Sequence, residues 1–295
     1  MARIHHPALH GAWLKGNTHI HSTASDGGMT TEQITRLYAG AGYDFLFAAD
    51  HWVNSCPAQP PSSPNGLRWI DGMELDGRDE TGAAFHVVCL GKVPAMDRSI
   101  GLLPALQKAR DAGAFTILAH PYWCGNTFDD VCRIPTDAIE VYNHVCHWIN
   151  GKGEGESYWH ARLAKNPATP AFAVDDAHLS ENHPGWNGGW IMVNTPDRSA
   201  DAILTAIRER HFYSTTGPQF RSIECRDGHV HLATSPIQMA WLVGPAWCGR
   251  RIGTMTERPL DEVDFKLPDD WPYAYVKIED AAGRCAWTNP LWSGC

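Results

Sequence analysis

Gly16-Asn17-Thr18-His19-Ile20-His21-Ser22-Thr23-Ala24-Ser25-Asp26-Gly27 runs from the end of a predicted strand into a polar loop. His19 and His21 are two residues apart, and side chains at this spacing lie on the same face of a strand. Asp26 follows in a loop of Ser and Gly residues that can fold back over both imidazoles. Two imidazoles and a carboxylate that converge at the end of a strand predict a metal site.

The length and composition predict a folded enzyme-sized protein. The chain has 295 residues, which permits one large barrel, or a barrel of about 200–250 residues with a small extra domain. Hydrophobic residues make up 43% and charged residues 19%, as is typical of globular proteins. The formal net charge of −9 disfavours a large nucleic-acid footprint, because such a surface has to neutralise many phosphates.

The cysteines and the hydropathy pattern indicate in which cellular compartment we expect the protein. The nine cysteines include no C-x-x-C pair, which favours reduced thiols in a cytoplasmic protein over a disulfide framework. No run of 18 apolar residues occurs, and residues 1–15 contain no apolar signal-peptide core. We therefore expect neither a secretion signal nor a membrane partner.

Short apolar runs alternate with helix signals through the first two-thirds of the chain. Thr30 and Gln33 form a capping-box pattern, and Gly42 ends the helix that follows. The predicted strands are 44–48, 67–75, 84–90, 115–119, 138–142, 171–174 and 190–193, and the predicted helices begin near residues 30, 104, 156 and 199. This alternation predicts an α/β fold with a largely parallel sheet.

Four polar residues lie at the C-terminal ends of these apolar runs, namely His51, His120, Glu140 and Asp176. Active sites form at this end of a parallel barrel, and also at the carboxyl edge of a doubly wound sheet. Because the candidates follow many different strands, we expect the barrel.

The pattern changes after residue 217. An Asp227-Gly228 turn separates two alternating segments, and 273–279 alternates again, without helical periodicity. We therefore predict two domains, a metal-dependent hydrolase barrel over 1–217 and a small antiparallel β-sandwich-like domain over 218–295.

The metal-site prediction depends on a set of residues and not on any one histidine. Asp176 and His178 repeat the two-residue spacing of the first pair. His86 has apolar neighbours, which favour a ligand over a solvent-exposed residue, and the alternative is a buried core histidine on a strand. The candidate ligands are His19, His21, Asp26, His51, Glu74, His86, His120, Asp176 and His178. Nine groups suffice for two or three divalent cations, with a carboxylate such as Glu74 bridging two of them.

The order of these motifs (HxH, SDG, DH, GxE, HP and DxH) resembles the PHP family of metal-dependent phosphoesterases (polymerase and histidinol phosphatase) over about residues 13–217. The amidohydrolase superfamily also begins with HxH, but it typically adds a strand lysine, which we do not find at a matching strand end. Segments 210–218 and 280–292 further resemble the carbaryl hydrolase-like subgroup, whose members carry a C-terminal β-domain.

The resemblance implies a distorted (β/α)7 barrel and three groups of ligands. One cation would take His19, His21, Glu74 and Asp176. A second would share Glu74 and add His86 and His120, and a third would take Asp26, His51 and His178. We expect Asp50 and Asp175 to support the adjacent ligands and so to belong to the catalytic residues.

Imidazole and carboxylate ligands suit Zn, Mn or Fe, which would activate a water as a hydroxide nucleophile. His144 is a candidate general acid, with His147 and His183 as alternatives. Hydrolysis of a small-molecule phosphoester, a monoester or diester, is the leading interpretation. The alternatives are hydrolysis of a carboxyl or carbamate ester at the same centre, and a non-catalytic metal-binding module.

Overall fold

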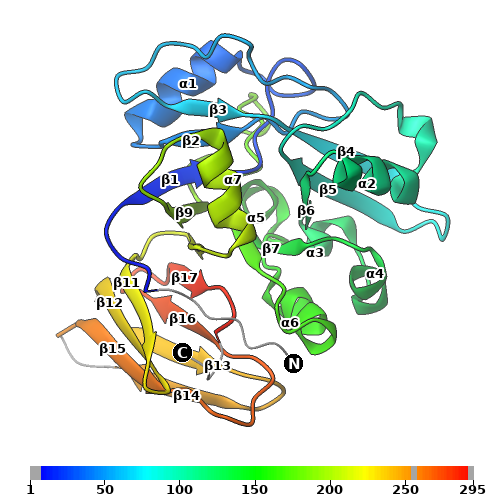
Figure 1. Ribbon diagram of the computed structural model, residues 1–295. Coiled ribbons are helices and arrows are strands. Elements are labelled where there is room, and N and C mark those ends of the chain that lie inside the picture. The colour runs from blue at the N-terminus through cyan, green and yellow to red at the C-terminus, as the bar shows by residue number, and fades with distance from the viewer. Residues whose placement is uncertain (1–7, 254–257, 292–295) are drawn as a thin grey trace.

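Strands and helices alternate in this computed structural model, which describes residues 8–253 and 258–291 (Figure 1). Trp292, the last residue of the subgroup resemblance, lies outside the described residues. The helices are α1 (Thr31–Gly40), α2 (Leu102–Asp111), α3 (Pro121–Cys124), α4 (Phe128–Arg133), α5 (His144–Asn150), α6 (Glu156–Lys165) and α7 (Ala200–Arg208), and Arg98–Ile100 forms a 3-10 turn. Within the described residues, no helix has the length and apolarity needed to cross a membrane.

One sheet of nine strands runs through the molecule in the order β14-β13-β16-β17-β10-β9-β1-β2-β3. β1 pairs in parallel with β2 but antiparallel with β9, and β9 pairs antiparallel with β10. The strands are β1 (Trp13–Asn17), β2 (Phe45–Phe47), β3 (Arg68–Ile70), β9 (Trp190–Asn194), β10 (Phe212–Thr215), β13 (Met239–Val243), β14 (Gly249–Gly253), β16 (Tyr275–Glu279) and β17 (Cys285–Thr288).

A second sheet has five strands in sequence order: β4 (Gly72–Arg78), β5 (Ala84–Leu90), β6 (Phe115–Leu118), β7 (Ala138–Asn143) and β8 (Ala171–Val174). β6, β7 and β8 are parallel, whereas β4, β5 and β6 are antiparallel neighbours. The expectation of a largely parallel sheet is therefore wrong for half of this sheet. Asp79 explains part of the difference, because its carboxylate accepts hydrogen bonds from the Thr81 and Ala83 amides and closes a tight turn. Such a short connection can join only antiparallel strands.

Two isolated backbone pairs join the two sheets at the end where the candidate ligands lie. Ile20, just beyond β1, pairs in parallel with Ala177, just beyond β8. His51, beyond β2, pairs in parallel with Glu74 of β4. The pairs link β1, β2, β4, β5, β6, β7 and β8 into a closed circuit. Both sides of the circuit are buried, so that Val87 and Val88 of β5 pack into different hydrophobic clusters.

The fold is thus a mixed α/β arrangement with three sheets, and the regular (β/α)7 alternation is not confirmed. No helix forms within residues 48–67, all of which are described, between β2 and β3. The predicted strand over 67–75 is in fact two strands that belong to different sheets: β3 pairs with β2, and β4 pairs with β5. The predicted capping box is confirmed, with Thr30 and Gln33 exchanging hydrogen bonds at the start of α1.

The C-terminal strands form two facing sheets, gathered at one end of the molecule in Figure 1. β11 (Phe220–Arg226), β12 (His229–Ile237) and β15 (Leu260–Lys266) form a three-stranded sheet whose apolar side chains pack against those of β13 and β16. The predicted hairpin turn is confirmed, because Asp227 and Gly228 both have positive φ, at 51° and 72°. β17 pairs with β10, so the nine-stranded sheet continues across the predicted boundary at residue 217.

Candidate metal centre

The structure brings all nine predicted ligand residues together at the junction of the two sheets. His19 and His21 follow β1, Asp26 lies in the loop before α1, and His51 follows β2. Glu74 and His86 lie on the facing strands β4 and β5, and His120 follows β6. Asp176 and His178 follow β8. The predicted convergence of distant strand ends is therefore observed.

The first predicted group is buried at the centre. Nε2 of His19 lies 3.1 Å from Oε2 of Glu74 and 3.2 Å from Oδ1 of Asp176. Nε2 of His21 lies 3.2 Å and 3.1 Å from the same two oxygens. Two imidazole nitrogens and two carboxylate oxygens thus surround one point, with all four side chains buried.

The second group uses the other oxygen of Glu74. Its Oε1 lies 2.8 Å from Nδ1 of His86 and 3.6 Å from Nε2 of His120. The same His120 nitrogen is 3.6 Å from Oδ2 of Asp176. His86 is therefore part of the cluster and is not a core histidine. Glu74 places one oxygen in each of two adjacent ligand groups, which is the arrangement of a bridging carboxylate.

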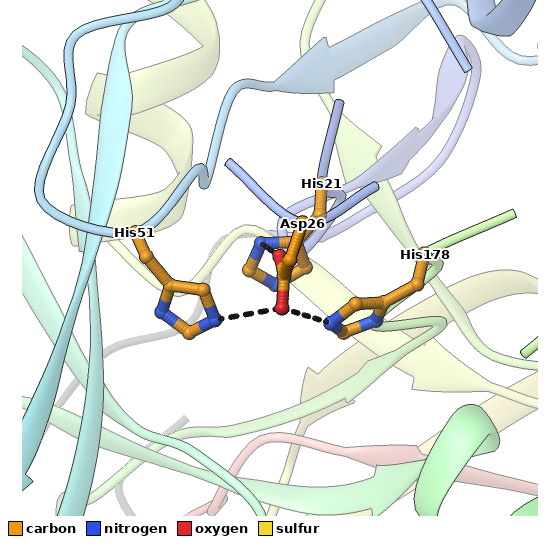
Figure 2. A group of neighbouring side chains, drawn as sticks. All are labelled: His21, Asp26, His51 and His178. Carbon is orange, nitrogen blue, oxygen red and sulfur yellow. Dashed lines mark ion pairs between the residues drawn. The ribbon is translucent and has the colours of Figure 1, made fainter. Parts of the chain in front are cut away.

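The third group surrounds Asp26, as Figure 2 shows. Oδ2 of Asp26 lies 3.3 Å from Nε2 of His178 and 3.7 Å from Nε2 of His51. Oδ1 lies 3.6 Å from Nδ1 of His21, a contact that the sequence did not predict. His21 thus presents one ring nitrogen to the first group and the other to the third. Asp26 is 54% exposed, so this group is the most open of the three.

Glu140 and Asn143 hold the ligands from behind. Oε1 of Glu140 lies 2.7 Å from Nδ1 of His19, and Oε2 accepts a hydrogen bond from the His120 amide at 2.8 Å. The Asn143 side-chain amide donates to Glu140 and also to Asp176. These contacts orient His19 so that its Nε2 faces the centre. Asn143 also caps α5, a helix that the sequence analysis did not predict.

Asp76 is a further neighbour that the sequence analysis missed. Its Oδ1 lies 2.9 Å from Nδ1 of His51, and Arg98 binds the same carboxylate oxygen at 2.9 Å. Asp76 is two residues beyond Glu74 on β4 and therefore shares its face. This spacing was available in the sequence and could have indicated the residue.

The two aspartates predicted to support the ligands lie behind the cluster. Asp50 accepts hydrogen bonds from the Ser22 amide, the Ser22 hydroxyl and the Ser25 hydroxyl, and so fixes the loop that carries Asp26. Asp175 accepts from the Tyr38 hydroxyl and from two glycine amides, on the side away from Asp176. Neither carboxylate lines the cavity in front of the cluster.

His144 is not placed where a general acid would have to act. It lines a separate cavity of about 440 Å³, and its Nδ1 is 3.1 Å from the Tyr142 hydroxyl. The difference arises because the chain turns into α5 directly after β7, which directs residue 144 away from the centre. His183, weighed as an alternative, does line the cavity beside the ligands.

The charges of the cluster favour protonated imidazoles. Burial disfavours the charged form of His21, but the carboxylates of Asp176 and Glu74 raise its pKa to about 9. Burial also opposes ionisation of Glu74, yet the adjacent His19 and His86 hold its pKa well below the usual value. Carboxylates that are ionised against such a cost need positive charge nearby, which protons on the imidazoles or a bound cation can supply.

Three buried imidazole nitrogens show whether the cluster suits a bound cation. Nε2 of His19, Nδ1 of His21 and Nδ1 of His51 have no hydrogen-bond partner in acceptable geometry, although carboxylate oxygens lie nearby. Buried polar atoms of native proteins are rarely left in this state. Nε2 of His19 and Nδ1 of His51 each lie near two carboxylate oxygens, and Nδ1 of His21 lies near one. This donor set fits divalent cations of the Zn, Mn or Fe class.

The backbone is strained at two of these ligands. His120 has φ 25° and Asp176 has φ 54°, both in a region that residues with a side chain seldom adopt. Trp52, directly after His51, has φ 55°. His120 and Asp176 both lie two residues beyond the end of a strand, where the chain leaves the strand direction. Strain of this kind concentrates at functional sites.

A cavity of about 190 Å³ opens in front of the cluster. Its lining includes candidate ligands together with Trp123, Val145, Cys146 and Ile149, and His183 lies beside His178. None of the described residues that line it is a lysine or an arginine.

Comparison with solved structures identifies similar folds. A two-domain protein from Bacteroides vulgatus, described as containing a predicted PHP-like metal-dependent phosphoesterase, matches over 98% of both chains with a TM-score of 0.51 and 16% identity. A putative metal-dependent phosphoesterase from Bifidobacterium adolescentis matches 58% of this chain and 90% of its own, at a TM-score of 0.42 and 11% identity. An amidohydrolase from Chromobacterium violaceum, with bound sulfate and no metal, matches 66% and 96%, at 0.46 and 15%.

No protein-family model and no curated protein matches the chain. The predicted PHP resemblance is confirmed at the level of the fold by the first of these structures, which extends over the C-terminal strands as well. The resemblance to the carbaryl hydrolase-like subgroup stays a prediction.

Proposed function

We propose that the chain is a metal-dependent hydrolase of ester bonds in small molecules, and that a phosphoester is its favoured substrate. The observation that carries the proposal is the position of Glu74, whose two oxygens belong to two adjacent groups of imidazoles and carboxylates. Adjacent cations held by a shared carboxylate suit the hydrolysis of phosphoesters. The description of the Bacteroides vulgatus protein as a phosphoesterase supports the same choice.

The proposed ligands form three groups. The first contains His19, His21, Glu74 and Asp176, and the third contains Asp26, His51 and His178 together with His21. The second contains Glu74, His86 and His120, which share Oε1 of Glu74. By mutual distance alone, His86 also groups with His51 and Glu74, and His120 groups with His19 and Glu140. We assign two cations to the buried groups and a third to the more exposed group at Asp26. The closed circuit of strands around them supports a distorted barrel as the underlying architecture.

Bound divalent cations would supply Lewis acidity, which lowers the pKa of a water and offsets charge on the ester oxygens. The residues of the chain hold and orient the reactants. Glu140 holds His19 through a hydrogen bond at Nδ1, and the Asn143 side-chain amide donates a hydrogen bond to Asp176. We assign to His183, which lines the cavity, the transfer of a proton to the leaving oxygen. In the balanced reaction, the oxygen of water bonds to phosphorus and the bond to the organic oxygen breaks. That oxygen keeps the electron pair and takes the proton.

A carboxyl or carbamate ester is the second candidate substrate. The apolar wall of the cavity and the lack of lysine and arginine among its described lining residues favour an ester of low charge. The same metals and the same water would serve this reaction. A purely structural role for the metals is less well supported, because structural sites are usually single and closed.

The test combines metal analysis with a substrate series. We expect elemental analysis to find two or three Zn, Mn or Fe ions per chain. Aryl phosphate monoesters or diesters should be hydrolysed with added Mn or Zn, and aryl carboxyl esters less well. His19→Ala and Asp176→Ala should lose at least about 100-fold in rate with an unchanged circular dichroism spectrum, whereas His10→Ala should keep wild-type rates.

Three results would contradict parts of this proposal. Hydrolysis of carboxyl esters alone would replace the phosphoester with the second candidate. Wild-type rates in His19→Ala or Asp176→Ala would exclude the site. Absence of all ester hydrolysis, with one metal at most, would favour the structural role.

A further inference from the structure

Part of the lining of the cavity is apolar, and two of these apolar residues, Trp123 and Ile149, are also exposed. Seven large hydrophobic side chains of the described chain are exposed, and five of them lie in three neighbouring segments, α3, α4 and α5. These five are Tyr122, Trp123, Phe128, Trp148 and Ile149. Exposed apolar side chains at a cavity commonly mark a binding surface, and here that applies to Trp123 and Ile149, which line it.

Two of the five line the cavity itself. Trp123 is 40% exposed, and its ring packs edge-on against His86 and His120, at centroid distances of 5.7 and 5.3 Å. Ile149 is 39% exposed and lies on α5, with Val145 one turn earlier on the same helix. A group bound at His86 and His120 would therefore lie beside the indole ring of Trp123, in a cavity that Ile149 also lines.

The cavity has no fixed positive charge beyond its imidazoles. Its described lining residues include no lysine or arginine, and Arg98, which lies beside the ligands, is bound to Asp76. A second anionic group that extends away from the cations toward Trp123 and Ile149 would lose its hydration without gaining a cationic side chain as partner, which is costly. The charge pattern thus disfavours substrates that carry a second anionic group at that part of the lining.

The size of the cavity limits the substrate further. Its volume is about 190 Å³. A cavity of about 150 Å³ suffices for one benzene molecule. One ring with a single head group is therefore the scale that fills this cavity, and the base, sugar and further phosphates of a nucleotide would have to extend outside it.

We infer that the substrate joins one reacting ester group to a single uncharged aromatic ring, and that this ring lies on Trp123 and Ile149. This inference rests on the proposed function, because the metals would hold the reacting group. It adds that Trp123 and Ile149 select the part of the substrate that lies beyond the reacting group.

The test measures binding of non-hydrolysable probes to the manganese-loaded protein by calorimetry. Phenylphosphonate and methylphosphonate share a head group and differ only in the ring, and 4-carboxyphenylphosphonate adds a second charge. We expect phenylphosphonate to bind at least about 10-fold more tightly than methylphosphonate, because the ring buries apolar surface. The carboxylated probe should lose at least about 10-fold relative to phenylphosphonate. Benzoate and acetate form a parallel pair for a carboxyl-ester substrate.

Variants locate the effect. Trp123→Ala and Ile149→Asn should each reduce the preference for the phenyl probe at least about fivefold, with methylphosphonate affinity and metal content unchanged. Trp148→Ala is the matched control: it removes a tryptophan from α5, the helix that carries Ile149. Trp148 is 52% exposed but does not line the cavity. It should keep the wild-type preference.

The outcomes separate the two proposals. Equal affinities within both probe pairs, or an unchanged preference in Trp123→Ala and Ile149→Asn, would overturn the inference and leave the proposed function standing. If neither phosphonates nor carboxylates bind the metal-loaded protein, the proposed function fails, and the inference fails with it.

Discussion

Glu140 illustrates at the scale of single residues how the centre is oriented. It is buried, and it contacts His19, the His120 amide and Asn143 at the same time. A carboxylate that holds the second nitrogen of a ligand histidine fixes the tautomer and raises the basicity of the metal-facing nitrogen. Glu140 therefore acts on the metals through other residues.

Glu140→Gln should weaken metal binding about 10- to 100-fold, because the amide cannot replace both charged hydrogen bonds. Competition with a fluorescent chelator measures the affinity, and thermal unfolding checks that the fold persists. Glu80→Gln, at an exposed turn position, is the matched control and should bind metal like the wild type. Equal affinities in the two variants would show that Glu140 has no influence on the centre.

Lys15 provides a pH test away from the ligands. Its ammonium lies 3.9 Å above the Tyr43 ring and 4.2 Å from the Trp190 ring. Burial lowers its pKa to about 8, although Asp175 and Asp44 partly oppose this shift. The unfolded chain, with an ordinary lysine pKa near 10.5, thus binds more protons between pH 8 and 10.5. The stability contributed by this residue therefore rises with pH in that window.

Lys15→Met should remove this rise. We expect the free energy of unfolding of the wild type to gain about 1 kcal/mol relative to Lys15→Met between pH 8 and 10, after allowing for solvent screening of a partly exposed group. Urea unfolding at several pH values measures the difference. Parallel pH profiles for the two proteins would contradict the lowered pKa.

Much of the centre could be predicted at this scale, because residue type and short spacing indicate which side chains can bind a metal. The spacing of His19 and His21 already indicated a metal site, and every predicted ligand lies at the cluster. The sequence analysis could not place His144, because its position depends on where β7 gives way to α5. The contact between His21 and Asp26 depends on the fold of a loop, which spacing does not determine.

At the scale of elements, Gly16 determines how closely β1 approaches β2. A Cβ at this position would collide with the ring of Phe45, which is fully buried. The pairing of Gly16 with Phe45 in these parallel strands therefore requires glycine. His19 follows three residues later, so the approach of the strands also sets the position of the first ligand.

Gly16→Ala should lower the free energy of unfolding by about 1–3 kcal/mol, the usual range for overpacking a core. Gly40→Ala is a control with the opposite sign. It adds a methyl group where no atom lies within 4 Å, at the end of α1, and should be neutral or stabilise by up to about 1 kcal/mol. Chemical denaturation compares the three proteins, and an unchanged midpoint in Gly16→Ala would refute the role assigned to this glycine.

The elements that could be predicted carry local signals. The capping box of Thr30 and Gln33 and the Asp227-Gly228 turn are examples, and the predicted limits of β5 and β8 and the predicted start of α6 agree with the structure. Strand direction is not a local property. Alternating apolar runs look alike in parallel and antiparallel pairs, so the sequence analysis missed the antiparallel arrangement of β4, β5 and β6.

At the scale of the whole molecule, the C-terminal strands complete a sheet that begins at the metal centre. β17 covers the edge of β10, and Tyr213 of β10 is buried in the cluster that contains Phe220 and Ile278. The predicted division at residue 217 would expose both a strand edge and an apolar face. Unpaired edges with apolar surface promote aggregation.

A chain that stops after residue 217 should therefore aggregate or lose cooperative unfolding. Soluble yield, analytical ultracentrifugation and circular dichroism measure the outcome against the full chain. A soluble monomer of residues 1–217 that unfolds cooperatively and binds metal would instead support two independent domains.

The pairing of Ile20 with Ala177 has a consequence for biosynthesis. The candidate ligands extend from residue 19 to residue 178, so the first imidazoles leave the ribosome long before the last carboxylate. Contacts between residues so distant in sequence form late, because the intervening chain must be ordered first. Until β8 has been synthesised, the exposed His19 and His21 can hold a cation only loosely. The order of translation therefore delays metal capture until most of the strand circuit exists, and the cell's free-metal pool must still supply the ions at that late moment.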